Sequence, residues 1–465
     1  MNRSVTAPVT NGRKKKTETK KDSSQEYLKT SNNDNEESSG LRTGLARPSL
    51  RESQITVYLS DSGNLENVQV IRVYLMDGSY KAIKIDPSAT TVEELWEIVA
   101  EKLMLTPFSS QMFFIWGVSG DLELLLFTHQ KISEVTSDWH IFEDRYNPQA
   151  SRLTRSATGP QKISKTSTAL PQMRTLTRTM STFTSKLTKS KTYGAQAGAM
   201  SALSMLQSQL DSEEFKLMFR TTAVVPLQSE EACTDPGAVH LFYIQAVFHV
   251  IRSNYPCDVQ TAIQLGGIQL QLNVGNRNPQ VHRPGYLREI LAQYVPEHLV
   301  EKMPAAEWER MLYTEHENHR DKDNLYLKQI YLKLVRQWKH YGCTFFKAQY
   351  RAPESLYYKH EYEGDVRLGI NQNGLHVIDP RELKIISFSF NQILEWDSEK
   401  DVFWVVVKEE IPKAKGFLTV KANPNREYYF KSPQAELLND LLWDWSDTLG
   451  GVHSSSKSPK QGNNS

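Results

Sequence analysis

The first residues that suggest chemistry are His319, Arg320 and Asp321, which spell the catalytic-loop triplet of protein kinases. In that loop the Asp accepts a proton from the substrate and an Asn five residues later holds a metal ion. Tyr326 stands in place of that Asn, and no glycine-rich phosphate loop precedes the triplet. We therefore interpret the triplet as part of a solvent-exposed turn.

Other reactive residue types also lack the spacing that chemistry requires. His316 and His319 are three residues apart, whereas zinc peptidases place their two histidines four apart on a helix. Cys257 follows a proline at a presumed helix start, where a small buried residue is more common than a nucleophile. The glycine pair 266–267 indicates close helix packing or a kink rather than a phosphate loop. The sequence predicts no catalytic residue, no metal site and no cofactor.

One short motif has a specific spacing. The run RSATGP fits the pattern Arg-Ser-x-Ser/Thr-x-Pro, which 14-3-3 proteins bind after phosphorylation, with Arg155, Thr158 and Pro160 in the defining positions. The added phosphate group, with a charge of about −2, would be bound by an arginine cluster of the partner. Thr177 and Ser181 follow arginines in the manner of basophilic kinase sites. Short patterns of this kind also arise by chance in basic segments rich in Ser and Thr.

The composition predicts a cytoplasmic protein of several domains. The chain has 465 residues, of which 39% are hydrophobic and 23% charged. It contains no run of about 18 uncharged apolar residues, no signal-peptide core, and Asn2 where myristoylation needs Gly. Its three cysteines form neither a disulfide framework nor a four-cysteine zinc site. Any membrane contact is expected to be peripheral, at the cytoplasmic face of the plasma membrane.

The net charge of +1 hides a strong asymmetry along the chain. Residues 1–52 carry +4, residues 452–465 carry +2, and residues 151–200 carry +9 with 18 Ser or Thr and no acid, which leaves about −14 elsewhere. An acidic folded body argues against nucleic-acid binding. The basic insert is expected to contact either the acidic body or anionic lipid weakly; a solvated linker is the alternative.

The N-terminal folded part is expected at residues 53–145. Apolar residues alternate over 68–85 around Asp77-Gly78, which predicts a hairpin. Thr91 and Glu94 predict a capping box at the start of a helix, and two further apolar runs follow. This order is typical of a ubiquitin-like β-grasp unit that closes near Phe142. Residues 1–52 and the Ser/Thr-rich insert 146–212 are expected to be disordered.

A helical part is expected at residues 213–340. Asp235 and Asp258 are predicted N-caps of two helices that end near residues 252 and 272. Further amphipathic helices are predicted in three segments: 286–303, 308–316 and 324–338.

The C-terminal part, 341–451, is a series of strands followed by one amphipathic helix, and residues 452–465 are a disordered tail. Asn373-Gly374 marks a tight hairpin, and Ser432-Pro433 opens the final helix. This layout is that of a phosphotyrosine-binding (PTB) or pleckstrin-like (PH) domain.

These three parts in this order resemble the FERM family, an α+β fold with a ubiquitin-like lobe, an all-helical lobe and a PTB/PH-like lobe. The similarity is greatest to the group of FERM domain-containing protein 8 and the Krev-interaction-trapped protein. Roughly 320 residues are involved, and six runs carry the resemblance: IRVYLMDGSYKAI (71–83), FFIW to LELLL (113–126), NYPCDV (254–259), YGCTFF (341–346), NGLHVID (373–379) and ILEWD (393–397). The long insert departs from the plain family pattern.

The resemblance implies a non-catalytic adaptor or scaffold. It would bind the cytoplasmic tail of an integral membrane protein, such as a rhomboid-like pseudoprotease or a Wnt co-receptor, and control its trafficking, stability or signalling. In PTB-like folds a peptide adds to the fifth strand beside the C-terminal helix. The matching residues are Ile393, Leu394, Trp396, Leu438, Leu441 and Trp445. Packing of helix on sheet is the alternative role for these side chains, and the cleft between the first and third lobes is an alternative tail site.

The resemblance also implies a second class of partner. The first lobe of the Krev-interaction-trapped protein meets a Rap-type small GTPase, and Lys81 and Lys84 on the second strand could face an acidic switch region. A solvated strand face is the alternative role for both lysines.

Overall fold

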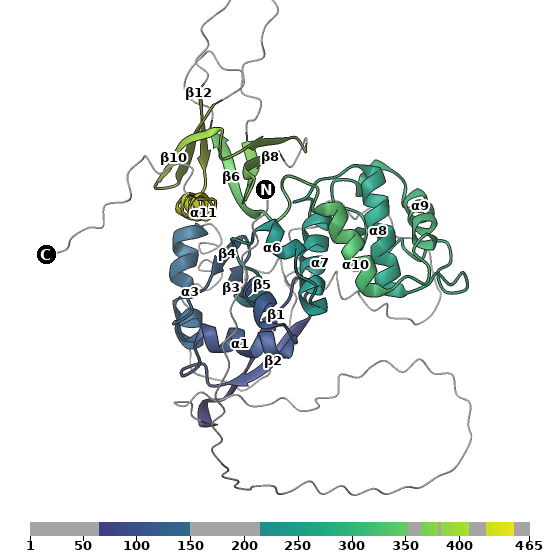
Figure 1. Cartoon of the computed structure of the whole chain (residues 1–465), viewed down its shortest axis with the longest axis horizontal. Helices are drawn as coiled ribbons and strands as arrows, with labels where there is room; N and C mark the ends of the chain where they lie inside the picture. Colours follow the sequence, from purple (N-terminus) through teal and green to yellow (C-terminus); the bar gives the residue numbers. More distant parts are fainter. Residues whose placement is uncertain (1–64, 149–213, 352–363, 380–382, 409–424, 451–465) are drawn as a thin grey trace, which may run out of the picture. The chain divides into compact units, whose positions relative to one another are not determined.

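The computed structural model describes residues 65–148, 214–351, 364–379, 383–408 and 425–450. All of them belong to the larger of two units in the chain, 54–465. Within this unit, Figure 1 shows a mixed α/β lobe, a helical lobe and a second sheet with one long helix, which we call lobes one, two and three.

Lobe one is a five-stranded sheet with helices. Its strands have the order β2-β1-β5-β3-β4, and β1 and β5 are parallel. The elements are β1 Gln69–Tyr74, β2 Tyr80–Ile85, α1 Val92–Lys102, α2 Pro107–Ser110, β3 Phe113–Ser119, β4 Leu122–Leu125, α3 Ile132–Tyr146 and β5 Lys216–Thr221, after a short 3-10 turn, η1 Leu65–Asn67.

The local signals in lobe one are confirmed. Gly78 has φ +70°, a backbone conformation that glycine adopts without strain, and the Asp77 carboxylate accepts the Ser79 N–H in the β1–β2 turn. The Thr91 hydroxyl accepts the Glu94 N–H while the Glu94 carboxylate accepts the Thr91 N–H. This capping box starts α1 at the predicted residue.

The predicted boundary between the first and second parts is wrong. Strand β5 follows the basic segment in sequence, yet it lies in the centre of the lobe-one sheet, between β1 and β3. The segment 149–213 therefore interrupts lobe one between α3 and its last strand rather than joining two finished lobes. The sequence prediction failed because β5 is short and stands next to a long polar run, so its pairing with β1 leaves no local signal.

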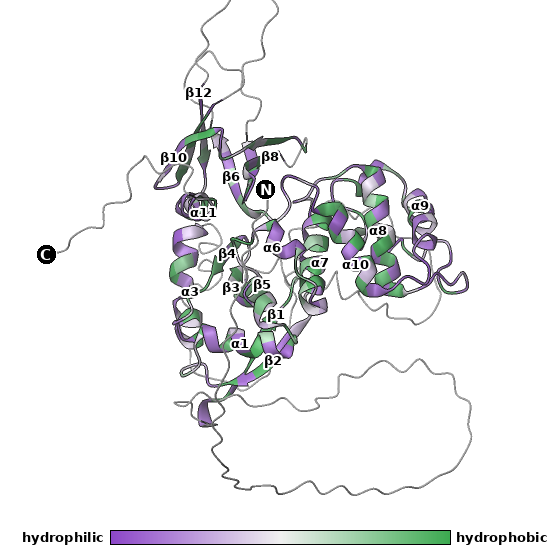
Figure 2. Cartoon of the chain, in the orientation of Figure 1, coloured by the Kyte–Doolittle hydropathy of each residue, from purple (hydrophilic) through white to green (hydrophobic). Residues whose placement is uncertain are grey.

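Lobe two contains the helices α6 Leu227–Glu231, α7 Pro236–Ile251, α8 Val259–Val274, α9 Ala305–Glu317 and α10 Asn324–Val335, with 3-10 turns η2 Leu291–Gln293 and η3 Val300–Lys302. Asp235 and Asp258 cap α7 and α8 as predicted. The predicted helix at 286–303 is wrong, because turns and the two 3-10 segments occupy that stretch. Figure 2 shows much hydrophobic green on α7 and α8, whereas α9 is mostly hydrophilic.

The glycine pair packs two helices closely, as predicted. A Cβ on Gly266 would lie 2.6 Å from Cδ2 of Leu312, and a Cβ on Gly267 would lie 2.5 Å from Cγ of Glu315. Both contacts are on α9, so α8 and α9 approach at a distance that only glycine permits.

Lobe three is a seven-stranded antiparallel sheet with one helix, so the predicted series of strands followed by a helix is confirmed. The strand order is β10-β11-β12-β6-β7-β8-β9, so β10 and β9 are its two end strands. The elements are β6 Thr344–Arg351, β7 Gly364–Asn371, β8 Gly374–Ile378, β9 Ile385–Phe388, β10 Ile393–Glu399, β11 Val402–Lys408, β12 Asn425–Lys431 and α11 Ala435–Thr448. Gly374 has φ +119° in the β7–β8 turn.

Candidate functional site

The edge of lobe three formed by β10 and α11 is the candidate peptide site. β10 is the fifth strand of the lobe and an end strand of its sheet. Helix α11 packs beside it, with the rings of Trp396 and Trp443 4.6 Å apart. Because an end strand offers backbone groups to another chain, this edge can accept an extended peptide.

Five of the six side chains predicted to line this groove belong to the core instead. Their exposed fractions are at most 6%, and they pack α11 onto the sheet: Ile393, Trp396, Leu438, Leu441 and Trp445. The sixth, Leu394, is half-buried. The apolar stripe of an amphipathic helix faces its own core first, which sequence periodicity alone does not distinguish from a ligand face. A charge placed at Ile393 or Leu441 would therefore unfold the lobe rather than test a groove.

The exposed side chains of the same two elements are acidic. β10 presents Glu395, Asp397 and Glu399 on alternating positions. They lie on the face of the sheet away from α11, because Trp396, on the other face, packs against Trp443 of α11. The described range of α11 carries four carboxylates spaced four, four and three residues apart, and neither element contains Lys or Arg: Glu436, Asp440, Asp444 and Asp447. We call these seven residues the acidic wall.

The carboxylates of α11 repel one another. The pKa of Asp440 is raised by partial burial and by the charges of Glu436 and Asp444. The pKa of Asp444 is raised by partial burial and by Asp447. Like charges held on one helix face raise the free energy of the ionised state, which an approaching cation would lower. The wall is therefore complementary to a basic partner.

Lobe one meets the start of α11. Arg145, at the end of α3, forms an ion pair with Glu436, and the Tyr146 hydroxyl donates to the same carboxylate at 3.2 Å. Between β3 and β4, Asp121 pairs with Lys347 at 2.6 Å and its carbonyl accepts the Gln434 side chain. These contacts join lobes one and three without involving the rest of the acidic wall.

A second polar cluster lies where all three lobes meet; its Arg220 is buried and its other members are half-buried. Arg220 of β5 pairs with Glu123 at 2.6 Å and lies 4.0 Å from the centre of the Trp116 ring. Arg367 of β7 donates to the side chain of Asn254 at 2.6 Å. A cavity of about 50 Å³ remains beside Arg220 and Asn254, too small for more than ordered water. We assign this cluster to lobe assembly.

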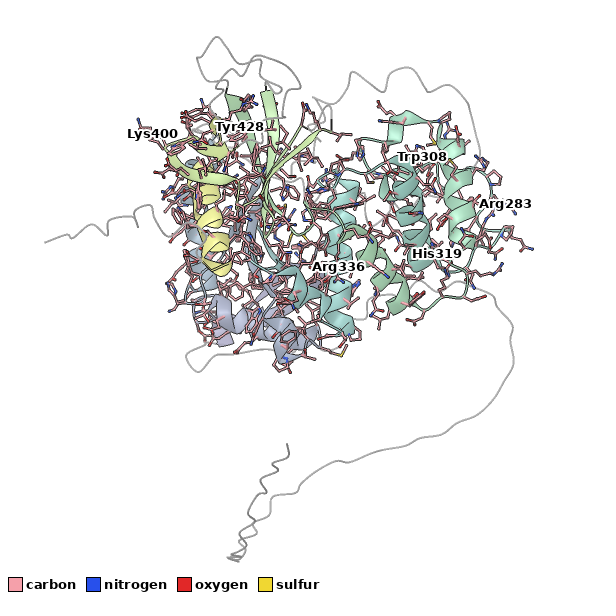
Figure 3. The ribbon with its side chains drawn as sticks, turned by 45° about the horizontal axis from the view of Figure 1, so that its top comes forward. Arg283, Trp308, His319, Arg336, Lys400 and Tyr428 are labelled. Atoms are coloured by element: carbon pink, nitrogen blue, oxygen red, sulfur yellow. The ribbon has the colours of Figure 1, made fainter. Side chains whose placement is uncertain are left out.

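Glu230 is a buried carboxylate at the junction between lobes two and three. It accepts Arg336 at 2.8 Å and the Tyr341 hydroxyl at 2.5 Å; Figure 3 labels Arg336 among the lobe-two helices. Burial raises the pKa of Glu230, while Arg336 and Tyr341 oppose that rise. Arg336 and Tyr341 therefore pair with the Glu230 carboxylate inside the protein, and the carboxylate is not available to a ligand.

The two lysines predicted to contact a GTPase do not share a face of the sheet. Alternation along β2 places Lys84 with Tyr80 on the outer face, where Arg72 lies 5.6 Å over the Tyr80 ring. Lys81 points to the other side, toward His240 on α7, whose pKa is lowered by burial first and then by Lys328 and Lys81. A separation of three residues puts strand side chains on opposite faces, which the prediction overlooked.

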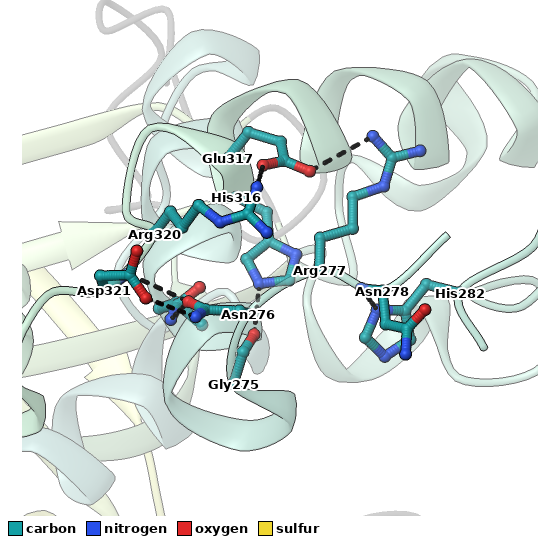
Figure 4. A network of polar contacts seen from close by, with 10 residues as sticks. Gly275, Asn276, Arg277, Asn278, His282, His316, Glu317, Arg320 and Asp321 are labelled. Carbon is teal, nitrogen blue, oxygen red and sulfur yellow. Dashed lines mark hydrogen bonds and ion pairs between the residues drawn. The ribbon is translucent and has the colours of Figure 1, made fainter. Parts of the chain in front are cut away.

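The kinase-like triplet lies in the turn between α9 and α10, as interpreted from the sequence, but its histidine is buried. Figure 4 shows the polar contacts around it. The Asp321 carboxylate accepts the Asn276 side-chain amide at 2.6 Å, and His316 bonds to the Gly275 carbonyl at 2.8 Å. Burial lowers the pKa of His316 and of His319. The triplet anchors the end of α8 and has no catalytic arrangement.

Among the described residues, two hydroxyl–imidazole pairs have the contact that nucleophilic catalysis needs. In lobe three, His376 Nδ1 lies 2.8 Å from the Ser387 hydroxyl and its Nε2 lies 3.1 Å from the Asn371 side chain, so this pair joins β8 to its neighbours. The other pair is in lobe two. The Ser253 hydroxyl lies 2.7 Å from His298 Nδ1, and His298 Nε2 lies 3.0 Å from the Cys257 carbonyl. Ser253 is buried, and its hydroxyl also accepts the His298 backbone N–H. The pair therefore fixes the 296–299 segment on lobe two.

Within the residues that the structure describes, no group of three or more His, Cys, Asp or Glu side chains could hold a metal ion. In the same part of the chain, no helix is both long and apolar enough to span a membrane. The predicted 14-3-3 site at Thr158 and the phosphosites Thr177 and Ser181 lie outside the described residues.

Three family models match successive parts of the chain. Residues 67–159 match the RA like domain, residues 228–346 the FERM central domain, and residues 364–441 the KRIT1/FRMD8, FERM domain C-lobe.

Similar proteins extend the likeness over most of the chain. FERM domain-containing protein B of Dictyostelium discoideum is 35% identical over 446 residues, which cover 86% of this chain and 91% of that protein. FERM domain-containing protein 8 of Xenopus tropicalis is 23% identical over 432 residues, 87% of this chain and 79% of that protein.

Among solved structures, the human Myosin 7b C-terminal MyTH4-FERM domain in complex with harmonin-a PDZ3 domain matches with a TM-score of 0.53 and 14% identity. The match covers 83% of this chain and 61% of that one. It bears on the fold alone.

The chain belongs to the FERM domain family, a class of protein-binding adaptors, and the predicted three-lobe fold is confirmed. Within the family, its third lobe is of the type shared by KRIT1 and FRMD8, so the predicted similarity to FERM domain-containing protein 8 is also confirmed.

Sequence reasoning missed the acidic wall, although its signal was present. The spacing of four acids along 436–447 and the alternation of three along 395–399 can both be read from the sequence. The prediction selected the apolar residues of the same elements, which form the core. Because those residues are buried, the polar residues are the ones that can contact a partner.

Proposed function

We propose that this protein is a non-catalytic adaptor that binds the cytoplasmic tail of an integral membrane protein along β10 and α11. The observation that carries the proposal is the acidic wall: seven carboxylates without Lys or Arg beside an end strand. Cytoplasmic segments next to membrane helices are rich in Lys and Arg. Such a tail would supply the missing cations while its backbone extends the sheet.

The finer identity of the partner rests on resemblance. Similarity to FERM domain-containing protein 8 favours a rhomboid-like pseudoprotease, whose complex carries a sheddase, or a Wnt co-receptor, and a role in trafficking, stability or signalling. The adaptor would then act in the cytoplasm, peripherally at the plasma membrane.

The test uses a fluorescent peptide from the juxtamembrane tail of a rhomboid-like pseudoprotease and the full chain. Replacing Asp440 and Asp444 by Asn should raise the Kd about threefold to tenfold, because two partly exposed charges each contribute up to about 1 kcal/mol. Higher salt should reduce that difference. Hydrogen exchange should slow in β10 when the peptide binds.

A matched control removes two exposed acids from lobe two, Glu301→Gln with Glu307→Gln, and should leave the Kd unchanged. Equal binding of the peptide to the Asp440/Asp444 variant and to the unmodified chain would contradict the proposed site. Protection confined to lobe one would instead favour the cleft between lobes one and three.

A second candidate function is the binding of a Rap-type GTPase by lobe one. Two observations favour it: residues 67–159 match the RA like domain, and β2 is an end strand whose outer face carries Tyr80 and Lys84 beside Arg72 of β1. GTP-loaded Rap should then bind more tightly than GDP-loaded Rap, and Lys84→Glu should abolish the difference. Lys81→Glu, on the other face of the same strand, is the control and should retain binding.

We propose two further roles for the basic insert of this adaptor. Phosphorylated Thr158 would recruit a 14-3-3 protein, with Arg155 and Pro160 completing the motif. The nine cations of 151–200 would bind weakly to anionic lipid or to the acidic wall, so phosphorylation of neighbouring Ser and Thr would weaken both contacts.

A further inference from the structure

A second groove lies at the opposite end of the lobe-three sheet, against lobe two. It has a volume of about 320 Å³. Its walls come from four segments: the α7–α8 connection and first turn of α8, the His298 loop, Trp338 after α10, and the residues at the start of β9. The lining residues are Pro256, Cys257, Asp258, Thr261, His298, Trp338, Leu383 and Ile385.

The groove runs beside a strand that ends its sheet. β9 pairs with β8 on one side and is the last strand in the order, so its other side offers backbone groups for pairing. Ile385 belongs both to β9 and to the groove wall. A peptide added to an end strand gains affinity from backbone hydrogen bonds and specificity from adjacent side-chain pockets, and this groove has both features.

The lining mixes apolar side chains with the polar Thr261 and His298, and it carries one charge. Trp338, Leu383 and Ile385 are half-buried and supply apolar surface. Burial lowers the pKa of His298, and burial raises the pKa of Cys257 to about 12, so both are neutral at pH 7. Asp258 is thus the one ionised side chain of the lining, and it is exposed.

The charge and the shape together define the occupant. The groove is open to solvent, and its volume of about 320 Å³ is at the lower limit for a small-molecule site. Beside an end strand, such a space suits one large side chain of a bound peptide. The Asp258 carboxylate also caps α8 by accepting the Thr261 N–H at 2.8 Å, so it presents a fixed negative charge at the mouth of the groove. A complementary segment carries Lys or Arg next to a large apolar residue.

We propose that this groove binds an extended peptide segment of a partner protein, which pairs with β9, inserts an aromatic or branched apolar side chain between Trp338 and Ile385, and places a Lys or Arg at Asp258. The site is separate from the β10–α11 edge. Lobe three would therefore hold two segments at once, one at each end of its sheet, which is the arrangement that a scaffold requires.

The test screens a positional-scanning library of acetylated decapeptides against the full chain and measures the best peptide by fluorescence polarisation. The library should select Trp, Phe or Leu adjacent to Lys or Arg. Thr261→Trp, which fills the groove from the first turn of α8, should raise the Kd at least about tenfold. Asp258→Asn keeps a good helix cap but removes the charge, and should raise the Kd about threefold to tenfold with loss of the salt dependence.

The controls separate this site from the tail site and from misfolding. Thr314→Trp, on the exposed side of α9, should bind as the unmodified chain does, and circular dichroism should be the same for all variants. Bound peptide should slow hydrogen exchange in β9 and not in β10. Selection of no sequence pattern, equal binding to Thr261→Trp, or protection at β10 alone would each overturn the proposal, whereas loss of tail binding at β10 would leave it standing.

Discussion

Two sets of carboxylates in this protein have opposite surroundings. Glu230 is almost fully buried and is bonded to Arg336 and Tyr341. The acidic wall of β10 and α11 is mostly exposed, and Glu436, with Arg145, is the member with a cationic partner among the ion pairs of the described residues. A buried charge strongly destabilises the fold unless an opposite charge pairs with it. An exposed row of like charges costs little stability.

The difference separates residues that hold the fold from residues available for binding. Removing a partner from the buried set should damage the fold, and removing a charge from the exposed set should damage binding while leaving the fold intact or improving it. The predictions below test this contrast, beginning with the largest effect.

Glu230→Ala is expected to lower the free energy of unfolding by about 3 to 5 kcal/mol, since it leaves Arg336 buried without its carboxylate. Chemical denaturation of the full chain measures the loss. Glu231→Ala is the matched control, because the neighbouring side chain is exposed, and it should change stability by less than about 0.5 kcal/mol. Similar losses of stability in both variants would contradict the structural role assigned to Glu230.

The junction of the three lobes should make stability depend on pH through His249. Burial and the nearby Arg220 and Arg367 lower the pKa of His249 to about 3, below its ordinary value near 6.5 in the unfolded chain. The stability that this residue contributes is therefore complete above about pH 6.5 and is lost as the pH falls from there toward about 3.

His249→Gln keeps an acceptor for Asn254 but cannot be protonated in this range. Between pH 6 and 4, its stability should fall less steeply than that of the unmodified chain, by up to about 1.4 kcal/mol per pH unit. His340 and His376, whose pKa values burial lowers to about 4, are common to both proteins and cancel in the comparison. Parallel curves for the two proteins would contradict the assignment.

The fold could be predicted from the sequence wherever its signals are local. The Asp77-Gly78 turn, the Thr91–Glu94 capping box and the Asp235 and Asp258 caps each depend on residues within four positions of one another, and each is confirmed. Strand β5 could not be placed, because its partners β1 and β3 are more than 90 residues away.

The candidate site was harder to predict than the fold. Sequence periodicity identified the correct strand and helix but selected their core residues, such as Ile393 and Leu441, because an apolar stripe has the same pattern whether it faces a core or a ligand. The two lysines of β2 were grouped by charge, although the two-residue period of a strand separates them. Burial, which only the folded chain defines, decides both cases.

The smallest expected effect is on the acidic wall itself, and its sign is the sharpest test of the contrast. The pKa values of Asp440 and Asp444 are raised in the folded chain, so folding is less favourable when they are ionised, and stability falls as the pH rises through the interval above the ordinary carboxylate pKa near 3.9. Replacing both by Asn removes that repulsion.

At pH 7 the double Asn variant should therefore be as stable as the unmodified chain or more stable by up to about 0.5 kcal/mol, while it binds the basic tail peptide less tightly. Thermal unfolding at pH 7 and at pH 4 measures the first change, which should shrink at the lower pH because the carboxylates are then partly protonated. A variant that is less stable at pH 7 would place these residues with Glu230, among the groups that hold the fold. A gain in stability with weaker binding would show that the chain retains mutual repulsion on α11 because a basic partner relieves it.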